Sequence, residues 1–132
     1  MDLCAFADIV NDTIAKLQER NQDVKLDKKQ QMATRIMEYI CKNYSQDISL
    51  DELSEKFRIS KTYINNLLKS FYHRSFLDIL QDYRLKEAKK MILENQYKIS
   101  EIAEKVGYHD ISYFIRVFKK KYGVTPNNYG KY

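Results

Sequence analysis

The sequence predicts an all-α fold in which a long linker helix joins two helix-turn-helix subdomains and an N-terminal leader helix precedes them. Three observations support this prediction. Only three of the 132 residues are glycine and one is proline, too few for the many turns of an all-β protein. Apolar residues recur at spacings of three and four, as on the inner face of a helix. A pattern of helix-turn-helix size also occurs twice along the chain.

The repeated pattern is the strongest of these observations. Residues 50–57 align with residues 99–106 at an offset of 49. Three pairs are identical at this offset: Glu52 and Glu101, Glu55 and Glu104, and Lys56 and Lys105. Past the turn the offset becomes 50, because the second copy has one extra residue, and there Tyr63 matches Tyr113. One helix-turn-helix can be a packing motif, but two in tandem on a basic chain favour binding to DNA.

Two helices are predicted before the first repeat. Residues 2–20 form a leader helix, whose apolar residues share one face: Leu3, Phe6, Val10, Ile14 and Leu17. The polar stretch 21–27 is a linker, and residues 28–44 form the next helix. We therefore assign residues 1–27 to a leader segment and residues 28–132 to a double helix-turn-helix domain.

The first helix-turn-helix unit spans about residues 50–72. Ser49 or Asp51 caps its short first helix, because either side chain can accept a hydrogen bond from a free N–H group of the first turn. After a three-residue turn, Ser60 caps a second helix over about 61–72.

A long amphipathic helix over about residues 75–94 joins the two units. Its apolar residues keep helical spacing: Phe76, Ile79, Leu80, Tyr83, Ala88, Met91 and Ile92. We interpret this segment as the linker helix.

The second helix-turn-helix unit spans about residues 99–122. Gly107 can take the left-handed conformation that ends the first helix of this unit, and Asp110 caps the second helix. Gly123 stops that helix, and Pro126 begins a last short helix at its favoured first position.

The net charge of +5 is unevenly distributed. Residues 1–27 carry six acidic and three basic side chains, a balance of −3, so residues 28–132 carry +8. A basic body attracts polyanions, whereas an acidic leader would not join the same binding surface. Charge alone is weak evidence, since many basic proteins bind no nucleic acid.

No pattern in the sequence is typical of an enzyme, a cofactor site or a metal site. Glycine-rich phosphate loops, nucleophile elbows and paired carboxylates are all missing. His73 and His109 lie in predicted turns without acidic or cysteine residues at ligand spacing, and Cys4 and Cys41 are far apart. The longest apolar runs are only a few residues, so no transmembrane helix is predicted and we expect a cytoplasmic protein. Five tyrosines fall mostly on apolar helical rows, which predicts packing in the core: Tyr39, Tyr44, Tyr83, Tyr108 and Tyr113.

The second helix of each unit is the expected recognition helix, with its first turns toward a DNA major groove. Asparagine can form two hydrogen bonds with adenine, and arginine two with guanine. The candidates for base contacts are therefore Thr62, Asn65, Asn66, Ser112 and Arg116. Lysines are flexible point charges that suit phosphate groups, and the candidates are Lys61, Lys69, Lys119 and Lys120. A solvated helix surface is an equally good interpretation of any one of these lysines.

The second unit and the linker helix also carry a family signature. The second unit contributes Ile99, Ile102, Ala103, Val106, Gly107, Tyr108, Asp110, Ser112, Tyr113, Phe114, Arg116, Phe118, Lys119, Lys120, Gly123, Val124, Thr125, Pro126 and Tyr129. The linker helix contributes Tyr83, Arg84, Leu85 and Ala88. At these spacings the residues closely resemble the signature of the AraC/XylS family of bacterial transcription regulators, over about residues 30–130.

This resemblance implies a seven-helix domain that places two recognition helices in successive major grooves of double-stranded DNA. Such regulators usually act as activators, which implies RNA polymerase as a partner. The chain departs from the family at His73, where the family commonly has glycine, as at Gly123 in the second unit. A non-glycine residue there must adopt a costly left-handed conformation or re-route the turn.

Residues 1–27 fit no part of the DNA-binding fold. We interpret them as the connection to an upstream sensor or receiver domain, and a complete small regulator is the alternative. The leader then either forms a homodimer through residues 2–20 or docks on the DNA-binding body. A different class of function also stays open, namely a protein-interaction module that keeps this fold without binding DNA.

Overall fold

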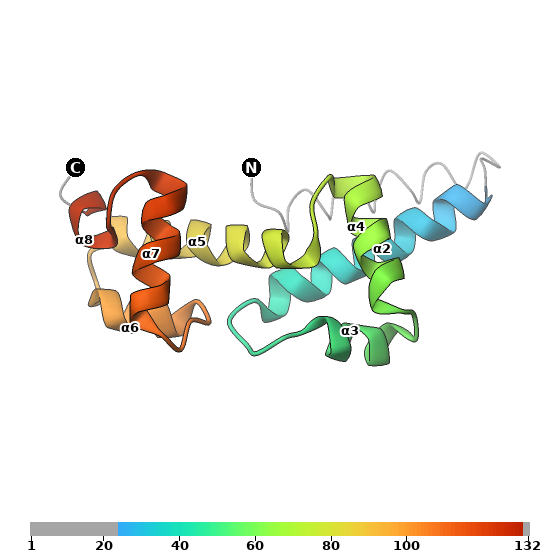
Figure 1. The fold of residues 1–132 in the computed structure, drawn as a ribbon, viewed down its shortest axis with the longest axis horizontal. Coiled ribbons are helices and arrows are strands. Elements are labelled where there is room, and N and C mark those ends of the chain that lie inside the picture. Colours follow the sequence, from blue (N-terminus) through green and yellow to red (C-terminus); the bar gives the residue numbers. More distant parts are fainter. Residues whose placement is uncertain (1–23, 131–132) are drawn as a thin grey trace. The chain divides into compact units, whose positions relative to one another are not determined.

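The computed structural model describes residues 24–130, and these residues form seven helices and no strand (Figure 1). In chain order they are α2 (Val24–Asn43), α3 (Leu50–Phe57), α4 (Lys61–Tyr72), α5 (Phe76–Glu94), α6 (Ile99–Lys105), α7 (Ile111–Tyr122) and α8 (Pro126–Tyr129). The all-α prediction is confirmed, while the predicted leader helix over residues 2–20 lies outside the described residues. No helix in residues 24–130 combines the length and apolar character needed to cross a membrane.

The described residues divide into two compact units, each with one helix-turn-helix. The first contains α2, α3, α4 and the first turn of α5, up to Leu80. The second contains the rest of α5 with α6, α7 and α8, and it also includes the loop Tyr44–Asp47. This loop lies between α2 and α3 in the sequence, but its contacts place it with the second unit.

The first unit is built around α4, which packs against both α2 and α3. Its buried apolar side chains are Ala33, Ile36, Met37, Ile40, Cys41, Ile48, Leu53, Ile64, Leu67, Leu68, Phe76, Ile79 and Leu80. Helix α2 begins at Val24, so the prediction of a linker up to Asp27 was wrong for its last four residues. No glycine or proline interrupts residues 24–27, and the buried Asp27 lies in the first turn, where a carboxylate is favoured by the helix dipole.

Capping side chains fix the helix starts in the first unit. Ser49, rather than Asp51, caps α3, and its hydroxyl accepts from the N–H of Glu52 at 3.2 Å. Ser60 caps α4 as predicted. Between the two helices the hydroxyl of Ser54 donates to the carbonyl of Ile59 at 2.6 Å, which ties the end of α3 to the turn.

The second unit has its own core between α5, α6, α7 and α8. The buried residues are Leu85, Ala88, Ile92, Ile102, Ala103, Val106, Tyr108, Phe114 and Phe118. The carboxylate of Asp110 caps α7 by accepting from the N–H groups of Ser112 and Tyr113 at 2.9 and 3.2 Å. Pro126 begins α8, so both predictions are confirmed.

Arg84 on α5 holds the loop Tyr44–Asp47 within the second unit. Its Nε donates to the carbonyl of Tyr44 at 2.7 Å, and its Nη2 donates to the carbonyl of Gln46 at 2.8 Å. The rings of Tyr44 and Tyr83 also pack together, with centroids 4.7 Å apart. Burial lowers the pKa of the Arg84 guanidinium from its ordinary value, and the two carbonyls replace water as its hydrogen-bond partners.

Five residues with positive φ end or follow helices in residues 24–130: Arg58, His73, Asn95, Gly107 and Gly123. Gly107 has φ +105°, as predicted, and a Cβ atom there would lie 2.8 Å from Nε of Arg84 and 2.9 Å from the carbonyl oxygen of Tyr44. Gly123 ends α7 with φ 82°. His73 ends α4 with φ 63° and ψ 22°, so this non-glycine residue adopts the left-handed conformation rather than re-routing the turn.

Candidate nucleic-acid interface

Helices α4 and α7 each present an exposed polar surface on the opposite side from their buried residues. In α4 the exposed candidates are Lys61, Thr62, Asn66 and Lys69, and the buried residues are Ile64, Leu67 and Leu68. In α7 the exposed candidates are Ser112, Arg116, Lys119 and Lys120, and the buried residues are Phe114 and Phe118. Eight of the nine predicted contact residues are therefore accessible to a ligand that lies along these helices.

The ninth candidate, Asn65, has a structural role in the connection between α4 and α5. It is half-buried, and its Oδ1 accepts a hydrogen bond from the N–H of Phe76 at 2.9 Å. That N–H belongs to the first turn of α5, where backbone donors need partners from outside the helix. An asparagine needs its carbonyl oxygen and its amide together to recognise adenine, and here the oxygen is occupied. The geometry thus favours Asn65 as a residue that fixes the end of α4 to the start of α5.

Lys61 is the first residue of α4 and forms an ion pair with Asp51 of α3. Both side chains are exposed, so solvent and salt screen the pair and it contributes little to stability. A phosphate group could therefore take the place of Asp51 at little cost. The neighbouring carboxylate nevertheless makes Lys61 a weaker phosphate ligand than Lys69, whose surroundings include no such ion pair among the described residues.

The guanidinium of Arg116 lies over the ring of Tyr113, with 5.5 Å between Cζ and the ring centroid. Such a cation–π contact orients the guanidinium without using its N–H donors. Tyr113 itself is 43% exposed, so the prediction that it packs in the core was wrong. It lies one residue before the buried Phe114 and four before the half-buried Val117, at the edge of the apolar row. The other four tyrosines of that group are buried or half-buried, as predicted.

Lys121, which follows the predicted phosphate ligands, binds a carboxylate within the protein. It forms an ion pair with Asp82 of α5, a carboxylate that is only 8% exposed, and Lys86 lies 3.3 Å from the same carboxylate. A buried carboxylate needs compensating charge, which Lys121 supplies while it fastens α7 to α5. Of three consecutive exposed lysines, Lys121 is thus bound to a buried carboxylate.

The structure also shows a pair that spacing along the chain could not reveal. Nε2 of His109 lies 2.6 Å from Oδ1 of Asp47, although 62 positions separate the two residues. Both side chains are largely exposed. Asp47 belongs to the loop that Arg84 holds, so the pair joins this loop to the turn before α7.

No group of three or more possible metal ligands occurs among residues 24–130.

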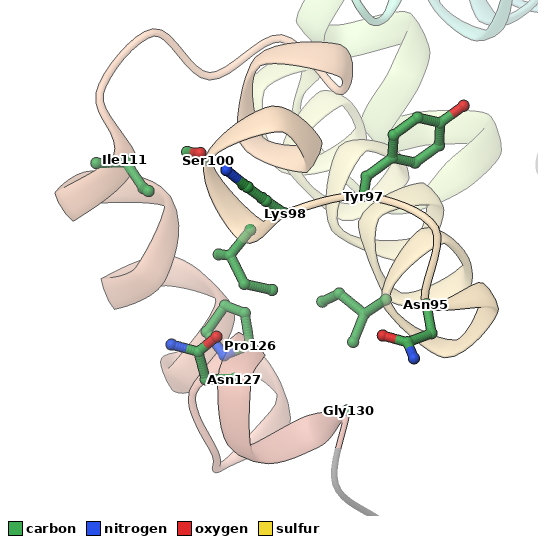
Figure 2. A pocket seen from close by; sticks show the side chains of 10 residues that line it. Asn95, Tyr97, Lys98, Ser100, Ile111, Pro126, Asn127 and Gly130 are labelled. Carbon is green, nitrogen blue, oxygen red and sulfur yellow. The ribbon is translucent and has the colours of Figure 1, made fainter.

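A cavity of about 460 Å³ lies in the second unit beside the starts of α6 and α8 (Figure 2). Its lining mixes apolar and polar residues: Ile92, Asn95, Tyr97, Lys98, Ile99, Ser100, Ile111, Pro126, Asn127 and Gly130. Figure 2 shows Ile111 at one margin, across the cavity from Tyr97 and Asn95. The lining contains no acidic side chain and one cationic one, and it suggests no catalytic chemistry.

Comparison with known proteins places this geometry among helix-turn-helix proteins. The profile of a family described as "Helix-turn-helix domain" matches residues 53–132. Among curated relatives, the HTH-type transcriptional activator CfaD of Escherichia coli is 37% identical over 98 residues, which are 74% of this chain and 37% of CfaD. The chain thus spans well under half the length of this relative.

Solved structures give the same result for the fold. The C-terminal domain of AraT, a response regulator from Geobacillus stearothermophilus, is 36% identical with a TM-score of 0.73, and the match covers 76% of this chain and 84% of that one. The DNA-binding domain of AdpA, solved in complex with a target DNA, has a TM-score of 0.71 over 75% of this chain and 89% of its own. At 15% identity, AdpA supports the fold alone.

Proposed function

Because this chain belongs to the AraC/XylS family of DNA-binding transcription regulators, we propose that it binds specific double-stranded DNA sequences through α4 and α7 and regulates bacterial transcription as an activator. Each helix would enter one of two successive major grooves. The family is a class of DNA-binding regulators and not a class of enzymes.

One observation carries the proposal. At the same position of each recognition helix, 50 residues apart, stand Asn66 and Arg116, and both are exposed. These residue types form paired hydrogen bonds with adenine and guanine respectively. A solvated surface would not require two different base-reading side chains at matching positions of a repeated motif.

The other exposed side chains complete the proposed contacts. Thr62 and Ser112 occupy equivalent positions in the first turns, where a hydroxyl can meet a base edge. Lys69 and Lys119 are also equivalent, and with Lys61 and Lys120 they would bind phosphate groups. Asn65 is left out of the proposed base contacts, because its carbonyl oxygen already binds the N–H of Phe76.

The proposed partners extend beyond DNA. An activator of transcription would contact RNA polymerase and act in the cytoplasm, where bacterial DNA lies. Residues 1–27 would connect the DNA-binding domain over residues 28–132 to an upstream sensor or receiver domain. In support, the chain matches only 37% of CfaD, and AraT is described as a response regulator of which the matched part is the C-terminal domain. The leader would also be the surface of any homodimer.

Selection of bound sequences from a random pool of DNA duplexes tests the proposal. We expect one bipartite sequence to emerge, and Arg116→Ala or Asn66→Ala should each weaken binding to it by about 1–3 kcal/mol and relax the preference at particular bases. Lys119→Ala should weaken binding to specific and random duplexes alike and make the salt dependence shallower by about one unit.

The control is Lys90→Ala, which removes the same charge from the exposed side of α5, where Lys90 lies 3.3 Å from Glu87. It should change affinity much less than Lys119→Ala. Equal losses of Arg116→Ala on specific and random DNA would reassign Arg116 to phosphate. Failure to select any sequence would favour a protein-interaction module instead.

A further inference from the structure

The two recognition helices differ at their first residue. Helix α4 begins with Lys61, and α7 begins with Ile111 at the equivalent position. Ile111 is 40% exposed, although isoleucine is neither a good helix former nor a capping residue. Its neighbours at the cavity margin leave this exposed part uncovered within the described residues. What distinguishes Ile111 from other exposed apolar residues, such as Leu93, is its place at the start of the proposed recognition helix α7.

A second isoleucine lies one turn behind Ile111. Ile115 is four residues further along, is half-buried and packs against the core of the second unit, and residues at this spacing are neighbours on one face of a helix. In α4 the equivalent residue is Asn65, whose side chain is polar and bound to Phe76. Helix α7 thus begins with an exposed apolar residue that is backed by a second apolar residue one turn later, whereas the equivalent residues of α4, Lys61 and Asn65, are polar.

The major groove of DNA offers one apolar feature to such a surface, the C5-methyl group of thymine. The first turns of a recognition helix are the part that meets base edges. We propose that Ile111, backed by Ile115, recognises a thymine methyl group in the half-site bound by α7, and that the half-site bound by α4 has no such contact. This inference rests on the proposed function and adds to it one specificity-determining residue and the group that it reads.

Arg116 supports this placement. Arg116 directly follows Ile115 in the sequence, and its guanidinium lies over the ring of Tyr113. A guanine and a thymine methyl group would therefore be read by adjacent parts of the same helix. The expected half-site therefore has a thymine within a few base pairs of the base whose preference depends on Arg116.

Replacement of thymine by deoxyuridine gives a direct test, because it removes the methyl group and leaves every hydrogen-bonding group of the base pair in place. The probe is the duplex obtained by selection, with each thymine replaced in turn. We expect about a fourfold loss of affinity at one thymine near the Arg116-dependent base, as for the burial of a single methyl group. Replacements in the other half-site should change affinity less than twofold.

The variant Ile111→Ala should lose affinity for the thymine duplex and should no longer distinguish it from the deoxyuridine duplex. Ile111→Val, which keeps a branched apolar side chain, should retain most of the discrimination. The matched control is Leu93→Ala, because Leu93 is an exposed apolar residue of the same unit outside both recognition helices, and it should keep the full deoxyuridine penalty. Far-ultraviolet circular dichroism of each variant checks that the helices remain.

Two results would overturn the inference while the proposed function stands. They are a deoxyuridine penalty that Ile111→Ala leaves unchanged, and a selected α7 half-site in which no thymine replacement matters. Failure of the chain to select any DNA sequence would instead remove the proposed function, and the inference with it.

Discussion

The two helix-turn-helix units use left-handed residues at equivalent places but for different reasons. In the turn of the first unit, Arg58 follows α3 with φ 56°, and at the equivalent place in the second unit Gly107 has φ +105°. At Gly107 a Cβ atom would overlap with Arg84 and with the Tyr44 carbonyl. The comparison teaches that a glycine in a repeated motif can be required by a neighbour as well as by its own backbone.

The helix ends that follow show the reverse case. Gly123 ends α7, and nothing lies within 4 Å of the place where its Cβ atom would be. The equivalent His73 ends α4 in the same left-handed region. Glycine at this position thus relieves backbone strain alone, and histidine tolerates that strain in the first unit.

The largest expected effect is that of Gly107→Ala. The new methyl group would meet a backbone carbonyl and a bound guanidinium, and alanine would also be strained at this φ, so we expect a loss of about 2–4 kcal/mol in the free energy of unfolding of the second unit. Gly123→Ala is the control and should cost only about 1 kcal/mol, because only the backbone term applies. Urea denaturation measures the free energy of unfolding of both variants. Equal losses would mean that the loop held by Arg84 moves to accommodate the methyl group at little energetic cost.

Loss of the hydroxyl group at Tyr108 should stabilise the second unit. This hydroxyl is buried and has no hydrogen-bond partner among the described residues. Tyr108→Phe should therefore raise the free energy of unfolding at pH 7 by about 1 kcal/mol. Thermal unfolding at fixed pH measures the change. A loss with Tyr108→Phe would reveal a hydrogen bond that the geometry does not show.

The burial of Tyr108 should also make the stability of the second unit depend on pH in the alkaline range. Burial raises the pKa of Tyr108 to about 12, so the folded state keeps the phenolic proton at a pH where the unfolded chain has lost it. Stability linked to this proton is fully present below about pH 10, the ordinary pKa, and is lost as pH rises toward about 12. Tyr108→Phe should flatten the decline in stability between these values. An unchanged decline would assign it to other groups.

A smaller effect is expected at the strained helix end of the first unit. His73→Gly should raise the free energy of unfolding by about 0.5–1 kcal/mol, since glycine populates φ 63° without steric cost. The reciprocal change Gly123→His should lower stability in the second unit by a similar amount. If His73→Gly destabilises the protein instead, the imidazole makes a contact that outweighs its backbone strain.

The smallest expected effect concerns the leader. Helix α2 begins at Val24 and buries Asp27 in its first turn, so removal of residues 1–23 is a cleaner deletion than removal of residues 1–27. Because the leader is acidic, the deletion should leave the affinity for a single DNA site unchanged or slightly higher. If the leader dimerises, sedimentation should show a concentration-dependent dimer that the deletion converts to a monomer. A tenfold loss of affinity with the fold intact would make the leader part of the DNA-binding surface.

The sequence by itself determined the helices and their ends. Ser60, Asp110, Gly123 and Pro126 act on backbone groups within a few positions of themselves, so their effect can be predicted from local spacing. The repeat also located both recognition helices and their exposed side chains. Local rules failed at residues 24–27, where polar composition suggested a linker and the chain is helical from Val24.

Only the tertiary structure decided which polar side chains already have a partner within the protein. Asn65 reaches an N–H that is 11 positions away, and Arg84 reaches a carbonyl 40 positions away. Lys121 looks like its two neighbours in sequence, but it forms an ion pair with the buried Asp82. The role of each of these side chains depends on a partner that folding brings close, and the helical period cannot identify a partner on another helix or loop. For this reason residue type and spacing located the candidate interface, and packing withdrew Asn65 from it.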